Sequence, residues 1–166
     1  MILIGIGANL PAPDGTPVLD SARGAAMRLD RLPGLRLRAL SCWYLTEPVP
    51  RSAQPPFVNA VAHLEGAEPD PAQLLVWLQA IEAAAGRIRG EPNAARTLDL
   101  DIIAMGTSGA AVRTVPDPIL PHPRAHLRAF VLAPLLDVAP RWLHPVLRRP
   151  ARDLLQDVAW QGIDRI

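Results

Sequence analysis

Three proline-rich segments divide this chain and limit where its helices and strands can run. They cover residues 11–17, 48–56 and 116–123, and they hold more than half of the 19 prolines. Proline has no backbone N–H and a fixed φ, so it is disfavoured in helix interiors and in the middle of a sheet. Regular elements must therefore lie mainly between these segments, where the periodicity of the side chains indicates their type.

Alternation with a period of two predicts the strands. In residues 57–65 one face carries Phe57, Asn59, Val61 and His63, and the other carries Val58, Ala60, Ala62 and Leu64. Residues 97–105 are also predicted to form a strand, in which Leu98, Leu100 and Ile102 lie opposite Asp99 and Asp101. Residues 2–7 form an apolar run typical of a buried strand. With residues 35–45, we expect four strands.

Helical spacing of apolar residues predicts helices at 17–31, at 127–137 and near 150–159. The clearest helix follows Asp70, a favourable N-cap residue, with Pro71 in its first turn, and ends at Gly86. The order strand–helix–strand–strand–helix–strand is that of a ferredoxin-like α+β fold, an antiparallel sheet with helices packed on one face and long loops. We expect residues 1–166 to form a single domain of this kind.

The composition is that of a globular protein, with 49% hydrophobic and 20% charged residues. The single cysteine, Cys42, allows no internal disulfide, so we expect a reducing, cytoplasmic compartment. The apolar runs are too short to span a bilayer, and the net charge of +1 argues against nucleic acid as a partner. We expect a monomer with no membrane or nucleic-acid partner.

Two aspartates on one strand face give the strongest chemical signal. Asp99 and Asp101 lie two residues apart in the string Arg-Thr-Leu-Asp-Leu-Asp-Ile at 96–102, so both project from the same side. Adjacent carboxylates repel each other unless a cation joins them, and oxygen ligands suit magnesium with nucleotide phosphates. The alternative is a solvent-facing strand edge with two ordinary acids. If the pair holds metal, replacing either one should leave the unliganded fold about as stable as before.

The basic residues near this pair indicate phosphate binding. All 17 basic residues of the chain are arginine, so phosphates must be bound by arginine, backbone N–H groups or metal. Arg87, Arg89 and Arg96 lie close to the aspartates in the sequence, and Arg128 lies beyond the loop that contains His122, a residue held between two prolines. Solvated surface charge is the alternative for any single arginine.

An aromatic ring beside an amide indicates a site for a flat heterocycle. Phe57 and Asn59 share a strand face, and Phe130 is the other phenylalanine of the chain. Both phenylalanines could instead belong to the core.

Gln79 and Glu82 lie on one side of the helix that starts after Asp70, facing either a nucleotide or water.

Together these motifs resemble the 6-hydroxymethyl-7,8-dihydropterin pyrophosphokinase family. The resemblance covers about residues 2–140, and its segments are 6–10, 44–48, 54–60, 81–89, 96–102, 120–124 and 128–135. The string at 96–102 and the Pro-His-Pro-Arg string at 121–124 are the most specific. The resemblance implies an enzyme that transfers diphosphate from ATP to the hydroxymethyl group of the reduced pterin, releasing AMP, in tetrahydrofolate biosynthesis.

The resemblance also implies roles for individual residues. Arg87, Arg96, Asp99 and Asp101 would be catalytic, and the two aspartates would hold two magnesium ions. ATP would contact Gln79, Glu82, Arg89, Ile102, His122 and Arg128. The pterin would contact Gly7, Thr46, Phe57, Asn59 and Phe130.

The chain departs from many relatives in one loop. Residues 90–95 form a short stretch without the tryptophan that these relatives carry there, and this difference affects how the loop would close over the site.

An alternative function is a ferredoxin-like nucleotide- or RNA-binding module without transfer activity. The low net charge, the 4% aromatic content and the paired aspartates argue against it.

Overall fold

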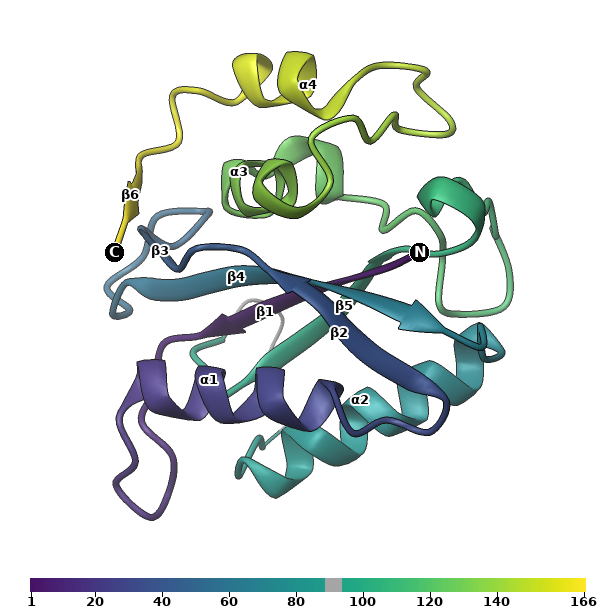
Figure 1. Cartoon of the computed structure of the whole chain (residues 1–166). Helices are drawn as coiled ribbons and strands as arrows, with labels where there is room; N and C mark the ends of the chain where they lie inside the picture. Colours follow the sequence, from purple (N-terminus) through teal and green to yellow (C-terminus); the bar gives the residue numbers. More distant parts are fainter. Residues whose placement is uncertain (89–93) are drawn as a thin grey trace.

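The computed structural model describes residues 1–88 and 94–166, and within them an antiparallel sheet runs through the middle of the molecule (Figure 1). Its strands are β1 (Ile2–Ala8), β2 (Leu35–Leu40), β3 (Tyr44–Thr46), β4 (Phe57–Gly66), β5 (Asp99–Ala104) and β6 (Ile163–Arg165). The strand order is β5-β1-β4-β3-β6, with β2 also paired to β4. This arrangement confirms the predicted α+β sheet and makes β1 and β4 its central strands.

Helices cover both faces of the sheet, so the prediction of helices on one face was wrong. Below the sheet in Figure 1 lie α1 (Val18–Leu29) and α2 (Pro71–Ala84), and above it lie α3 (Ala129–Val138) and α4 (Ala151–Asp157). Each face has its own apolar core. Ile4, Leu64 and Leu100 pack towards α1 and α2, whereas Leu3, Val61 and Ile103 pack with α3 and α4. The central strands are apolar on both faces for this reason.

Local sequence accounts for the elements that were predicted correctly. Asp70 caps α2 by accepting hydrogen bonds from the backbone N–H groups of Ala72 and Gln73, and Pro71 occupies the first turn. Gly86, at φ 77°, follows the helix in the left-handed conformation that favours glycine. Two short 3₁₀ helices, Thr107–Gly109 and Ala125–Leu127, lie in the connections after β5.

Two strand predictions needed revision. The segment predicted as one strand at 35–45 is two strands, β2 and β3, because the chain leaves the ladder near Ser41 and Cys42. There the Ser41 hydroxyl accepts from the Val61 N–H at 2.9 Å, and the Cys42 N–H donates to Asp137 at 3.1 Å. The strand β6 was not predicted; it pairs with β3 at the edge of the sheet. Among the described residues, no helix is long and apolar enough to cross a membrane.

Candidate active site

A cavity of about 560 Å³ opens on the face of the sheet that also carries α3. Its floor is formed by β1, β4 and β5. Its walls come from the segment after β3, from the segments before and after β5 and from the start of α3. Most of the predicted site residues line it. They are Gly7, Thr46, Phe57, Asn59, Arg87, Arg96, Asp99, Asp101, His122, Arg128 and Phe130.

Two glycines of β1 keep the floor of the cavity open. Gly7 pairs with Asn59 on one side and with Asp99 on the other, and Gly5 pairs with Asp101. A Cβ atom at Gly7 would come within 3.2 Å of the Asn59 side-chain oxygen, which is closer than ordinary packing. Because glycine has no side chain, the cavity floor is unobstructed between the Asn59 amide and the Asp99 carboxylate.

Asp99 is held by two arginines. Its carboxylate accepts from Arg87 and from the Arg96 guanidinium, the latter at 2.6 Å. Arg87 also donates to Glu82, whose carboxylate is 3% exposed and accepts from the Leu100 N–H at 2.7 Å. Burial works to lower the pKa of Arg87, but the Asp99 and Glu82 carboxylates raise it above its ordinary value. The network fixes two guanidinium groups at the cavity wall.

Asp101 lacks such a partner among the described residues. Within the described parts of the chain, His122 Nε2 lies 3.9 Å from an Asp101 carboxylate oxygen, and the Asp101 side chain is 44% exposed towards the cavity. Burial among the cavity walls and the neighbouring Asp99 carboxylate raise the pKa of Asp101, against the influence of His122 and Arg128. Such an under-compensated carboxylate is suited to a cation.

His122 is fixed from two sides. Its backbone N–H donates to the Ile103 carbonyl at 2.9 Å, and its Nδ1 accepts from the Arg124 N–H at 3.1 Å. Burial lowers the pKa of His122, although Asp101 raises it in part. The imidazole therefore presents Nε2 towards Asp101 and the cavity. Arg124, which also lines the cavity, is a residue for which the sequence reasoning gave no role.

The other end of the cavity carries polar and aromatic groups. Asn59 is 5% exposed, and its amide donates to the Thr46 hydroxyl at 2.7 Å. Phe57 and Phe130 are half-buried and line the cavity, so neither is an ordinary core residue. The Arg96 guanidinium lies 6.0 Å from the Phe57 ring centre, and that of Arg128 lies 5.3 Å from the Phe130 ring centre.

Asn9 joins two walls of the cavity, a role that sequence reasoning missed. Its side chain is buried at 2% exposure, donates to the Pro55 carbonyl at 3.0 Å and accepts from the Arg96 N–H at 2.8 Å. It also donates to Gln54, which lines the cavity. The sequence carried one signal for this role, because Asn9 is a polar residue directly after the apolar strand β1.

Three predicted site residues do not line the cavity, and a fourth falls outside the described residues. Gln79, Glu82 and Ile102 are not part of the described cavity lining; Ile102 is 4% exposed in the core beside α1 and α2, and Glu82 lies behind Arg87. Arg89 and most of the loop at 90–95 fall outside the described residues.

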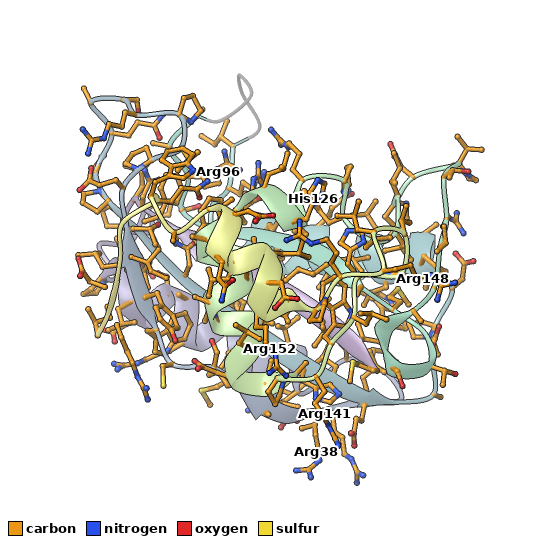
Figure 2. The ribbon with its side chains drawn as sticks, turned by 90° about the horizontal axis from the view of Figure 1, so that it is seen from above. Arg38, Arg96, His126, Arg141, Arg148 and Arg152 are labelled. Carbon is orange, nitrogen blue, oxygen red and sulfur yellow. The ribbon has the colours of Figure 1, made fainter. Side chains whose placement is uncertain are left out.

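Not all arginines of the described residues lie at the site. Figure 2 shows Arg96 far from Arg38, Arg141 and Arg152, which lie towards the opposite edge of the molecule.

Comparison with known proteins identifies the fold and the family. The sequence model of the 7,8-dihydro-6-hydroxymethylpterin-pyrophosphokinase family (HPPK) matches residues 3–140, a span that contains every described cavity residue. The chain belongs to the HPPK family. Its match includes β1, β4 and β5 and therefore the entire floor of the cavity.

Two curated relatives with the pyrophosphokinase name match over most of their length. The chain is 37% identical to 2-amino-4-hydroxy-6-hydroxymethyldihydropteridine pyrophosphokinase of Pseudomonas aeruginosa over 165 residues, which covers 99% of this chain and 96% of that protein. It is 41% identical to the Mycobacterium leprae protein of the same name, over 82% of this chain and 71% of that protein.

Solved structures show the same fold. The wild-type HPPK-DHPS of Plasmodium falciparum with pteroate matches with a TM-score of 0.68 at 13% identity, covering 94% of this chain. This chain spans only 44% of the length of that solved chain. The likeness is therefore one of fold, and it supports the HPPK architecture described above.

Proposed function

We propose that this chain transfers diphosphate from ATP to the hydroxymethyl group of 6-hydroxymethyl-7,8-dihydropterin and releases AMP. Membership of the HPPK family supports the reaction. The observation that carries it is the row Asn59–Gly7–Asp99, which crosses three neighbouring strands on the cavity floor. Neighbouring strands lie about 4.8 Å apart, so the Asn59 amide and the Asp99 carboxylate lie roughly 10 Å apart. The amide would bind the edge of the pterin ring, and the carboxylate would face the phosphates.

The basic residues around Asp99 and Asp101 would bind the triphosphate. Arg87 and Arg96 hold Asp99, Arg128 also lines the cavity, and His122 presents Nε2 towards Asp101. Guanidinium groups form paired hydrogen bonds with phosphate oxygens and keep their charge at any physiological pH. Because Arg87 and Arg96 are already oriented by Asp99, they are placed before the nucleotide arrives and can stabilise charge on the transferred group.

Magnesium fits this pair of aspartates. Asp99 and Asp101 offer carboxylate oxygens on one strand face, and burial together with the Asp99 carboxylate raises the pKa of Asp101. Magnesium usually keeps several waters and takes further ligands from substrate phosphates, so two carboxylates are enough to hold it there. We propose that these aspartates hold two such ions, which would neutralise charge on the phosphates during transfer.

The end of the cavity that carries Asn59 would bind the pterin. Phe57 and Phe130 supply aromatic faces for a flat ring, and the Asn59 amide supplies a donor and an acceptor for its edge. The bond from Asn59 to Thr46 fixes the amide orientation before binding. With the ring held there, its hydroxymethyl oxygen would point along the glycine floor towards the β-phosphorus, in the position needed for attack.

We also propose that the chain acts as a single domain and a monomer. Neither nucleic acid nor a membrane is needed for the reaction proposed. A cytoplasmic location stays a prediction, based on the single cysteine and the compartment in which folate precursors and ATP would meet.

The products of one incubation test the proposed function. The chain is mixed with magnesium, ATP and the reduced hydroxymethylpterin, and the nucleotides are separated by anion exchange. We expect AMP and pterin diphosphate in equal amounts, and none without the pterin. Asp101→Asn should abolish the reaction, whereas Asp20→Asn, at an exposed ion pair with Arg23, should not change it. Release of ADP, or no product from the wild type, would contradict the proposal.

A further inference from the structure

Gln161 lies outside the cavity lining, yet it holds the backbone on both sides of Arg128. Its Oε1 accepts from the Ala129 N–H at 3.0 Å, and its Nε2 donates to the Leu127 carbonyl at 2.9 Å. The side chain is 8% exposed. Leu127 and Ala129 are the two sequence neighbours of Arg128, and Phe130 follows directly.

The start of α3 needs an outside partner, and Gln161 provides it. The N-cap residue of α3 is Arg128, with an extended backbone at φ −131° and ψ 110°, and its side chain makes no cap hydrogen bond. A guanidinium has no acceptor, so it cannot satisfy the free N–H groups of a first helical turn. The Gln161 carbonyl oxygen takes the role that serine or aspartate usually fills locally. Arg128 is thereby free to project its side chain into the cavity.

Gln161 is itself anchored from two directions. Its backbone N–H donates to the Val158 carbonyl at 3.0 Å, at the end of α4, and Val158 packs in the core with α3. Two residues later, Ile163 begins β6 and pairs with Thr46 on β3. Figure 1 shows this C-terminal segment running from α4 past α3 to the edge of the sheet. It therefore connects the Arg128 wall of the cavity with the Thr46 wall.

We propose that Gln161 is a positioning residue that sets Arg128 and Phe130 for substrate binding. It lies beyond residue 140, where the match to the family ends. The inference rests on the proposed function, because it assigns Arg128 to ATP and Phe130 to the pterin. Arg128 lies between the two residues that Gln161 fixes, and Phe130 directly follows Ala129. The Arg128 guanidinium lies 5.3 Å from the Phe130 ring centre, so the two side chains would shift together.

Gln161→Leu introduces a side chain of similar volume that makes neither hydrogen bond. The matched control is Gln156→Leu, on the exposed side of α4. The readout is the dissociation constant for a non-hydrolysable ATP analogue with magnesium, measured by calorimetry well below the melting temperature. Loss of a helix cap typically changes an equilibrium by about three- to ten-fold, and we expect Gln161→Leu to weaken binding by that factor. Gln156→Leu should bind like the wild type.

A double-mutant cycle separates positioning from mere stability. In an Arg128→Ala background, Gln161→Leu should weaken ATP binding no further, because its effect acts through the missing guanidinium. If the two losses multiply, or if Gln161→Leu only lowers the melting temperature, the positioning role is refuted. Should Gln161→Leu fail to fold, Gln161→Glu keeps the acceptor for Ala129 but not the donor for Leu127, and it should still weaken binding measurably. Absence of binding by the wild type would refute the proposed function as well.

Discussion

Asp99 and Asp101 are two residues apart on one strand face, yet the structure predicts a clear loss of stability only when Asp99 loses its charge. Asp99→Asn removes the anion that Arg87 and Arg96 share. Asp101→Asn removes a carboxylate whose raised pKa reports burial and repulsion from Asp99. The sequence alone led us to expect little loss of stability for either change, and the ion pairs of Asp99 contradict that expectation.

The size of the effect follows from the burial of the partners. The side chains of Asp99, Arg87 and Arg96 are only 23%, 16% and 19% exposed, so solvent screens them weakly. A hydrogen bond to a charged group contributes about 1.5–3 kcal/mol, and asparagine retains one acceptor, so the loss should be roughly 1.5–3 kcal/mol. For a chain of this size the melting temperature should fall by roughly 3–12 °C. Asp101→Asn should change stability by no more than about 0.5 kcal/mol, or raise it slightly.

Thermal unfolding followed by circular dichroism, at neutral pH with a chelator present, measures both variants against the wild type. The two substitutions are chemically identical, so each is the control for the other. Equal melting temperatures for Asp99→Asn and the wild type would refute the ion-pair reasoning. An equal fall for both variants would show that the aspartates are equivalent, which the geometry excludes.

Three further predictions test other parts of the structure. Tyr44 is the single tyrosine, and burial together with its bond to Asp137 raises its pKa to about 12, so tyrosinate absorbance should titrate near pH 12 in the folded chain. Since the ordinary pKa is 10.0, this stabilisation is complete below pH 10 and is lost as the pH rises towards 12; a midpoint near 10 before unfolding would contradict it. Phe57→Leu should weaken pterin binding about ten-fold and ATP binding little, as measured by calorimetry, and equal losses would make Phe57 a core residue. Glu82→Gln should lower the melting temperature by several degrees with little change in the KM for ATP, unlike the exposed Glu68→Gln, and the reverse pattern would restore Glu82 as a nucleotide contact.

Local patterns predicted the site where they decide which face a side chain takes. The alternation in 57–65 and 97–105 put Asn59, Asp99 and Asp101 on defined faces, and the register of β1 between β4 and β5 then brought them together. Spacing along a helix says nothing about depth. Glu82 was predicted to contact ATP from its place beside Gln79 on one side of α2 and from the family resemblance, whereas it is buried and holds Arg87 and the Leu100 N–H.

Long-range contacts explain the remaining differences. The strand predicted at 35–45 is interrupted because Ser41 and Cys42 bond to Val61 and Asp137, the latter 95 residues away in the sequence. The strand β6 has three residues and too little alternation to be recognised, and it forms through its pairing with β3. Gln161 belongs to the same class, since only the folded chain brings it to the start of α3.

The most direct test of the central claim is a crystal structure with the reduced hydroxymethylpterin, a non-hydrolysable ATP analogue and manganese in place of magnesium. Anomalous scattering locates the manganese independently of any assumption about the site. We predict manganese bound by the carboxylates of Asp99 and Asp101, with the phosphates against Arg87 and Arg96 and the pterin ring between Phe57 and Phe130. Well-ordered ligands with the metal away from both aspartates, or the ring away from both phenylalanines, would contradict the account.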